Sequence, residues 1–122
     1  MAIQQDIGKL GEELAKAFLE KKGYQILALN WRFSKAEIDI IAQDGDDLVF
    51  VEVKTRSSEH FGPPAAFVSP KKEELMAQAA SIYMEENYYE GEIRFDIIGI
   101  LLKDKDHPII RHYVDAFFPG WG

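Results

Sequence analysis

The chain shows two kinds of hydrophobic pattern, one with helical spacing and one with the density of β-strands. Residues 5–22 carry apolar side chains every three or four positions, which predicts an amphipathic helix that ends at Gly23. A second helix is predicted over residues 70–88, because Ser69 suits its N-cap and Pro70 suits its first position.

The other apolar stretches are short, rich in Ile, Val, Leu and Phe, and bounded by turn-forming residues, as strands are. Helix, three strands, helix and two strands, in that order, predict an α/β fold with a mixed central sheet flanked by helices. No repeat or linker interrupts this order, so we expect a single domain over residues 1–122. The predicted strands cover residues 24–32, 37–43, 48–56, 93–102 and 109–114.

Composition is that of an ordinary globular protein, with 47% hydrophobic and 29% charged residues. We expect neither a membrane span nor a signal peptide, because the sequence has no long apolar run and no basic-then-apolar leader. The absence of cysteine excludes disulfides and thiolate metal sites. These features together favour a cytoplasmic protein with no membrane partner.

The formal net charge of −7 argues against a broad phosphate-binding surface. A net charge is a sum over the chain, however, and does not show where the charges lie. A cluster of catalytic carboxylates would lower it, and bound divalent cations would partly reverse it locally.

Two predicted strands each carry two polar residues at alternate positions within otherwise apolar runs. Glu37 and Asp39 lie in the second strand, and Glu52 and Lys54 lie in the third. Residues two apart on a strand share a face. Charged groups on buried strands are costly unless they pair with each other or hold a cation. The alternative is a solvated strand face with cross-strand salt bridges.

The turn between these strands decides which polar side chains face each other. A turn centred on residues 45–46 places Asp39 opposite Glu52, whereas a turn centred on residues 44–45 places Glu37 opposite Glu52. Both turns have an even number of residues, so both keep the polar residues on one face. The sequence does not decide between them. The reverse face is then aliphatic and must pack on a helix; it consists of Ile38, Ile40, Ala42, Val49, Val51 and Val53.

A strand face of this kind is suited to a hard cation. Mg²⁺ takes oxygen ligands, usually one or two carboxylates together with waters and substrate phosphates. Lys54 would lie beside the cation, where it could position a water molecule or stabilise charge that develops on a phosphate.

Asp39 and the segment Glu52-Val53-Lys54 resemble the PD-(D/E)xK signature of restriction-endonuclease-like nucleases. The order of elements resembles the αβββαβ core of that superfamily, with a short C-terminal strand added. Over essentially its whole length the chain is similar to the YraN family of small bacterial proteins, which are related in fold to archaeal Holliday junction resolvases; it departs from them at Ala36, where glycine is usual. The motifs that carry this similarity are Gly8-x-x-Gly11-Glu12-x-x-Ala15, Gly23-Tyr24-x-Ile26-Leu27, Asn30-Trp31-Arg32, Glu37-Ile38-Asp39-x-Ile41, Val49-Phe50-Val51-Glu52-Val53-Lys54-Thr55-Arg56, Phe61-Gly62-x-Pro64 and Arg94-Phe95-Asp96.

The resemblance implies a metal-dependent nuclease that hydrolyses phosphodiester bonds, with branched DNA such as Holliday junctions among its substrates. It implies Asp39 and Glu52 as ligands of Mg²⁺ or Mn²⁺, with the Val53 carbonyl as a further ligand. Lys54 matches the catalytic lysine, and Glu37 takes a supporting role.

The resemblance also implies an acidic ligand from the first helix, for which Glu12 and Glu13 compete. Gly8, Gly11 and Ala15 form a stripe of small residues that allows this helix to approach the sheet closely. Glu12 flanks the stripe and Glu13 lies on its other side, which favours Glu12. Helix surface charge is the alternative for both residues.

Arg32, Arg56 and Lys72 are cationic residues near the proposed site that could contact phosphates. We therefore expect nucleic acid as the partner, with DNA favoured over RNA. The apolar segment 117–121 either folds back onto the core or forms a subunit contact, which leaves a homodimer open. Asp96 is expected in a structural salt bridge or hydrogen bond. The alternative function, favoured by the net acidity, is a non-catalytic nucleic-acid-binding or adaptor module that keeps the nuclease fold.

Overall fold

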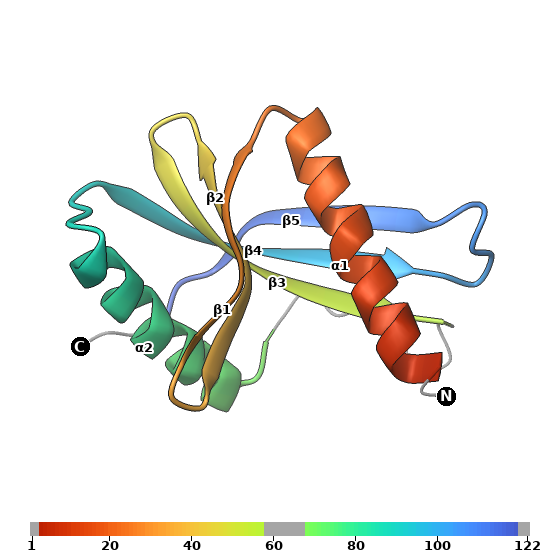
Figure 1. Cartoon of the computed structure of the whole chain (residues 1–122), viewed down its shortest axis with the longest axis horizontal. Coiled ribbons are helices and arrows are strands. Elements are labelled where there is room, and N and C mark those ends of the chain that lie inside the picture. Colours follow the sequence, from red (N-terminus) through yellow and green to blue (C-terminus); the bar gives the residue numbers. More distant parts are fainter. Residues whose placement is uncertain (1–2, 58–67, 120–122) are drawn as a thin grey trace.

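The computed structural model describes residues 3–57 and 68–119 (Figure 1). The order of helices and strands within these ranges is the predicted one, and it confirms the α/β fold with a mixed sheet. The motif Phe61-Gly62-x-Pro64 lies outside the described residues. The elements are α1 (Ile3–Lys21), β1 (Gln25–Phe33), β2 (Ala36–Asp44), β3 (Asp47–Arg56), α2 (Pro70–Glu86), β4 (Glu92–Leu101) and β5 (Ile109–Phe117).

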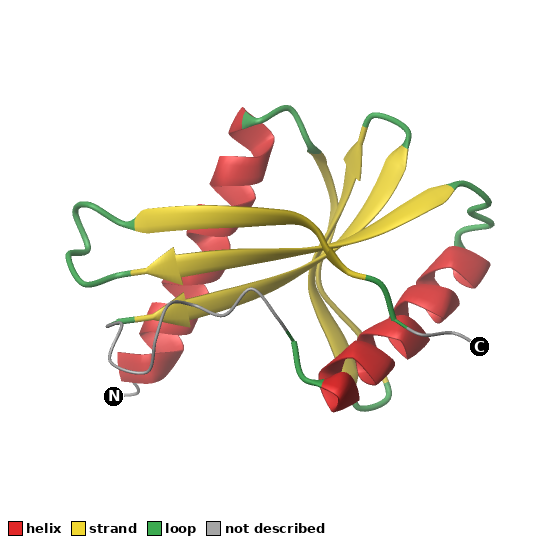
Figure 2. Ribbon diagram, turned by 180° about the vertical axis from the view of Figure 1, so that it is seen from behind, coloured by secondary structure: helices red, strands yellow, loops and turns green. Residues whose placement is uncertain are grey.

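The strands form one five-stranded sheet in the order β1-β2-β3-β4-β5. β3 and β4 are parallel and are connected through α2, whereas the other neighbours are antiparallel. Figure 1 shows α1 in front of the strands, and the reverse view in Figure 2 shows it behind them. Because α1 contributes to one hydrophobic core and α2 to the other, the helices cover opposite faces of the sheet.

Alternating side chains of the sheet build two cores. On the face covered by α1, Ala15 and Leu19 pack against aliphatic residues such as Ile40 and Val51. On the face covered by α2, Met76 packs in a cluster that contains the rings of Phe50 and Phe95. The members of this second core are Ala36, Ile38, Ile41, Leu48, Phe50, Met76, Ala79, Ala80 and Phe95. Asp39 lies between Ile38 of the second core and Ile40 of the first.

Helix boundaries follow the signals in the sequence. Gly23 follows α1 with a φ of 97°, a left-handed conformation that glycine adopts without strain. The Ser69 hydroxyl accepts a hydrogen bond of 3.2 Å from the backbone N–H of Lys72, and Pro70 is the first helical residue of α2. In the described part of the chain, neither helix is long and apolar enough to cross a membrane.

The C-terminal strand is longer than predicted and returns to the core. Phe117 pairs with Phe95 at a ring-centroid distance of 5.2 Å, and Phe118 lies 5.9 Å from the same ring. The described part of the apolar tail therefore folds back onto the α2 side of the sheet, while residues 120–122 lie outside the described range.

Candidate functional site

The candidate site lies where β2 and β3 separate. Their antiparallel pairing runs from Asp44 opposite Asp47 to Ile40 opposite Val51. This register confirms the turn centred on residues 45–46, because Gly45 has a φ of 59° at the first central position. The alternative, a turn centred on residues 44–45, is excluded by this register. Beyond the last pair β3 continues along β4 while β2 continues along β1, and the divergence is visible at the centre of Figure 1.

β2 changes the direction of its side chains at this point. Strict alternation predicts Ile38 on the same face as Ile40, yet Ile38 packs in the α2 cluster and Ile40 in the α1 cluster. The prediction for Ile38 is wrong because it assumed a regular strand. Ile38 stays paired with Trp31 of β1, and the preceding Asn30 is left-handed, with a φ of 50°. Asp39 lies between Ile38, which faces α2, and Ile40, which faces α1.

Asp39 and Glu52 form the centre of the site. Asp39 is only 8% exposed, and burial raises its pKa to about 7, with the charge of Glu52 as the second cause. Burial also raises the pKa of Glu52, against the opposing charge of Lys72. Glu52 Oε1 is buried and has no hydrogen-bond partner among the described residues, and the Lys72 ammonium lies 3.6 Å from it. The fold thus holds two unfavourably buried carboxyl groups side by side.

Two lysines from different elements approach this pair. Lys54 follows Glu52 by two residues on β3, and partial burial lowers its pKa while the Glu52 charge opposes the shift. Lys72 comes from the first turn of α2. The structure pairs Lys72 with Glu52. The phosphate contact predicted for Lys72 stays a prediction.

Glu12 and Glu37 lie at the edge of the site. Burial raises the pKa of Glu12, and the charge of Asp39 is the second cause, so α1 brings this carboxyl close to the central pair. With its amide nitrogen assigned to face the two acids, the side chain of Asn30 donates to Glu12 and to Glu37, each at 3.2 Å. Arg32 lies 3.4 Å from Glu37. Asn30 was part of a motif in the sequence, but only its contacts show that it bridges two acids from α1 and β2.

A glycine contact sets the position of α1. A Cβ at Gly11 would lie 1.9 Å from the Oγ1 atom of Thr55 on β3, whereas a Cβ at Gly8 would meet nothing within 4 Å. Close approach therefore depends on Gly11 and not on Gly8. Glu12 follows Gly11 directly and is half-buried, while Glu13 is exposed, so the structure places Glu12 toward the site.

The remaining predicted phosphate contacts are exposed. Arg56 ends β3 and borders a hollow of about 320 Å³ that is also lined by Gly8, Thr55 and Ser57. Arg32 is exposed at the other side of the site. Ala36 occupies the position where the similar family usually has glycine. It lies in a regular strand opposite Phe33, so the structure needs no glycine there.

Acidic residues gather at the opposite end of the sheet. Asp44 is five residues from Asp39 along β2, or about 16 Å at the usual rise of a strand. The segment after α2 meets this turn, because the Tyr89 hydroxyl donates to the carbonyl oxygen of Glu92 at 2.6 Å and lies 3.2 Å from that of Asp46. Much of the negative charge thus lies away from the site. The acidic residues of this end are Asp44, Asp46, Asp47, Glu85, Glu86, Glu90 and Glu92.

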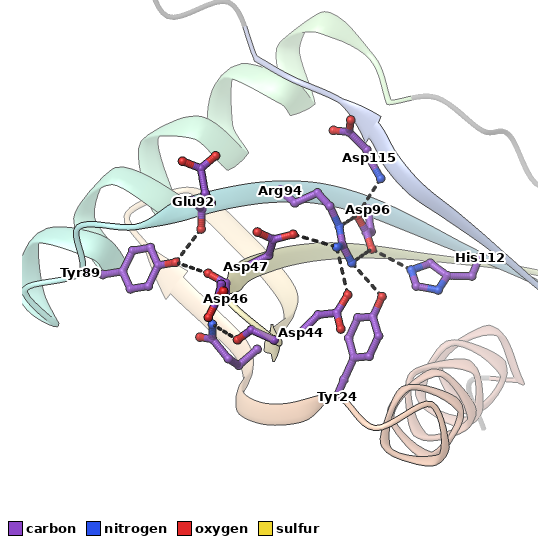
Figure 3. A network of polar contacts seen from close by, with 12 residues as sticks. Tyr24, Asp44, Asp46, Asp47, Tyr89, Glu92, Arg94, Asp96, His112 and Asp115 are labelled. Atoms are coloured by element: carbon purple, nitrogen blue, oxygen red, sulfur yellow. Dashed lines mark hydrogen bonds and ion pairs between the residues drawn. The ribbon is translucent and has the colours of Figure 1, made fainter.

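A separate polar network ties β4 to its neighbours (Figure 3). Asp96 is fully buried and accepts two hydrogen bonds from Arg94, at 2.9 and 3.0 Å. It is also 2.7 Å from His112 Nε2 and accepts from the backbone N–H of Asp115. These hydrogen bonds hold the pKa of Asp96 below its usual value although burial alone would raise it. The predicted structural role of Asp96 is confirmed.

The central pair fits a hard divalent cation. A cation between Asp39 and Glu52 would relieve their repulsion and give a ligand to the Glu52 oxygen that accepts no hydrogen bond. In the described ranges, no three His, Cys, Asp or Glu side chains are arranged to hold an ion by themselves. Waters, the Val53 carbonyl or a substrate would supply the other ligands, which is usual for Mg²⁺.

Comparison with known sequences identifies a family. Residues 11–100 match the model of "Uncharacterised protein family UPF0102". The chain is 52% identical over 118 residues to UPF0102 protein FP2501 of Flavobacterium psychrophilum, covering 97% of this chain and 98% of that protein. It is 49% identical to a UPF0102 protein of Christiangramia forsetii, with coverage of 97% and 98%, and 43% identical to one of Carboxydothermus hydrogenoformans, with coverage of 90% and 93%. The chain therefore belongs to the UPF0102 family.

Proposed function

We propose that this protein is a divalent-metal-dependent nuclease that hydrolyses phosphodiester bonds in DNA, with branched DNA such as a Holliday junction as its substrate class. The observation that carries the proposal is the close pair of Asp39 and Glu52, with a buried Glu52 oxygen that accepts no hydrogen bond and with Lys54 two residues away. A pair of buried carboxyls with raised pKa values reduces stability, and such sites are retained where chemistry needs them.

The metal would be Mg²⁺ or Mn²⁺, held by Asp39 and Glu52 with the Val53 carbonyl, and the Glu12 side chain would turn toward the ion on binding to complete the ligand set. When bound, it would supply Lewis-acid stabilisation of the charge that develops on the phosphate. The half-buried Glu37 would stay in the supporting position that its contact with Asn30 gives it.

Lys54 would act on the attacking water. From its place two residues after Glu52, Lys54 would position this water and stabilise the charge that develops on the phosphate. The water oxygen bonds to phosphorus, one ester P–O bond breaks, and the leaving oxygen gains a proton. Arg32 and Arg56, both exposed beside the site, would contact flanking phosphates of the DNA backbone.

Cleavage assays with a four-way junction, a flap, linear duplex DNA, single-stranded DNA and RNA test this proposal in Mg²⁺ and in Mn²⁺. We expect Asp39→Asn and Lys54→Met to lower the cleavage rate by about 100-fold or more. Circular dichroism would show that both variants keep the fold. Absence of metal-dependent cleavage by the wild type on every substrate would overturn the enzyme assignment.

Matched controls come from the exposed turn between β4 and β5. Asp106→Asn and Lys105→Met make the same chemical changes at exposed positions in another part of the chain. Neither variant should change the cleavage rate. A loss of cleavage in these controls would show that net charge, and not the central pair, limits the reaction.

The ion pair between Lys72 and Glu52 supports a second candidate, a non-catalytic nucleic-acid-binding or adaptor module with the same fold. At 3.6 Å the Lys72 ammonium supplies positive charge where a metal would otherwise be needed. Calorimetric titration with Mn²⁺ separates the candidates. DNA binding without any Mn²⁺ binding by the wild type would favour the adaptor.

A further inference from the structure

Asn30 has a backbone conformation that most residues avoid. It lies inside β1 with a φ of 50°, and its neighbours Leu29 and Trp31 are paired with Ile40 and Ile38 of β2. Asparagine tolerates this left-handed region better than other residues with a side chain, apart from aspartate. The unusual conformation therefore sits within a regular ladder, directly beside the strand that carries Asp39.

The side chain of Asn30 connects three elements. Its NH₂ group donates to Glu12 Oε1 of α1 and to Glu37 Oε2 of β2, each at 3.2 Å. The reverse orientation would place the amide oxygen against two carboxylates, so the hydrogen-bond network fixes the assignment. Both protons of one amide are thus used on acids that would otherwise repel each other.

Without this bridge, repulsion by neighbouring carboxylates would favour movement of the Glu12 side chain out of the site, and an adjacent hollow could accommodate it. Glu12 lies close enough to Asp39 and Glu37 for their like charges to repel it. A hollow of about 190 Å³ lies beside Glu12 and is also lined by Lys9, Lys16 and Leu29. A glutamate side chain at this half-exposed position could turn into that hollow, toward the two lysines.

We infer that Asn30 is a positioning residue whose amide holds Glu12 and Glu37 together beside Asp39, so that Glu12 can take part in binding a divalent cation. This inference rests on the metal-dependent function proposed above. The residue acts through Glu12 and does not itself contact the cation. Groups that orient metal ligands in this way commonly contribute a factor of about 10 to 100 in metal affinity.

The test is a double-mutant cycle read out by Mn²⁺ affinity, measured by calorimetry on the full chain. Asn30→Gly removes the amide and keeps the left-handed backbone without strain. We expect it to weaken Mn²⁺ binding by about 10-fold. Glu12→Gln should weaken binding at least as much, and Asn30→Gly should add no further loss in the Glu12→Gln background.

Ser34→Gly is the matched control. Ser34 is also left-handed, with a φ of 57°, and lies exposed in the turn between β1 and β2. It should bind Mn²⁺ as the wild type does. Urea unfolding of each variant at the same pH shows whether Asn30→Gly remains folded during the titration.

Each outcome is decisive. Wild-type Mn²⁺ affinity in Asn30→Gly overturns the role of Asn30 and leaves the proposed function standing. A 10-fold loss that persists in the Glu12→Gln background overturns the route through Glu12. Failure of the wild type to bind Mn²⁺ overturns the metal site itself. This outcome is separate from the others because it is seen in the wild type, with Asn30 intact. The inference is supported if Asn30→Gly weakens Mn²⁺ binding in the wild-type background and causes no further loss in the Glu12→Gln background.

Discussion

The backbone N–H of Val53 donates a hydrogen bond of 2.8 Å to Oδ2 of Asp39. This bond begins where the ladder between β2 and β3 stops, so a side-chain carboxylate replaces the carbonyl that a paired strand would offer. Asp39 is therefore held by the backbone while its charge is opposed by burial and by Glu52. Asparagine keeps an acceptor oxygen for Val53 and removes the charge, which makes Asp39→Asn a cleaner probe than alanine.

Asp39→Asn should stabilise the protein above neutral pH. The pKa of Asp39 is about 7 in the folded chain, against 3.8 as the ordinary value. The folded state therefore binds more protons than the unfolded state between these values, and its stability falls as the pH rises through this window. At about 1.4 kcal/mol per pKa unit, the loss reaches at most about 4 kcal/mol.

Urea unfolding of the wild type and of Asp39→Asn between about pH 4 and pH 8 measures this difference. The gap between the two curves should widen with pH in favour of the variant and level off above about pH 7. Asp106→Asn serves as the control and should follow the wild type. A constant gap over the whole range would show that Asp39 titrates normally.

Divalent-metal affinity should depend on the same proton. Binding of Mn²⁺ requires the ionised carboxylate, so below the pKa of about 7 for Asp39 the affinity should rise by about tenfold per pH unit. Above that pKa it should become independent of pH. Calorimetry in two buffers with different ionisation enthalpies would detect release of about one proton below pH 7 and none well above it. Equal affinity on both sides of neutrality would contradict a protonated Asp39.

The sequence was sufficient for the order of helices and strands because caps, glycines and apolar runs are local signals. It could not choose between the two even turns, since that choice depends on a distant residue. Asp44 and Asp47 face each other across the observed turn, which repulsion would disfavour. Arg94 of β4 lies 3.0 Å from one and 3.2 Å from the other and compensates both.

The site shows the same limit. The polar strand face left either Asp39 or Glu37 opposite Glu52, and only the resemblance to the PD-(D/E)xK signature favoured Asp39. The structure brings Asp39 and Glu52 together. Alternation could not foresee the change of face at Ile38, which accompanies the left-handed Asn30 of another strand. The pairing of Lys72 with Glu52 also depends on how α2 packs, and no spacing in the sequence encodes that contact.

Gly11→Ala should be destabilising, and Gly8→Ala should not. A Cβ at Gly11 would clash with the Thr55 side chain, so α1 must shift away from β3 at a cost of about 1–3 kcal/mol. A Cβ at Gly8 meets open space, and alanine there should gain about 0.5–1 kcal/mol from helix propensity. Urea unfolding compares the two variants. Mn²⁺ binding should also weaken in Gly11→Ala, because the shift carries Glu12 with it.

The pair of glycine variants is decisive because both change the same residue type in the same helix. Equal effects on stability would mean that propensity dominates and that α1 does not depend on close contact with Thr55. Adding Thr55→Ala to Gly11→Ala removes the Oγ1 atom that lies nearest the new Cβ. This second change should restore part of the lost stability.

Arg94→Met should unfold the protein more easily without altering the metal site. Asp96 is fully buried, and removal of the arginine leaves its charge, within the described ranges, with His112 and one backbone N–H as partners. Breaking a buried ion pair in this way costs about 3–5 kcal/mol. Arg111→Met is the control, because Arg111 is exposed on β5 and should change stability by less than about 0.5 kcal/mol. Under conditions where Arg94→Met remains folded, its Mn²⁺ affinity should equal that of the wild type, since Arg94 contacts the Asp44–Asp47 end of the hairpin and not Asp39. A parallel loss of Mn²⁺ affinity would show that the two networks are linked through β3.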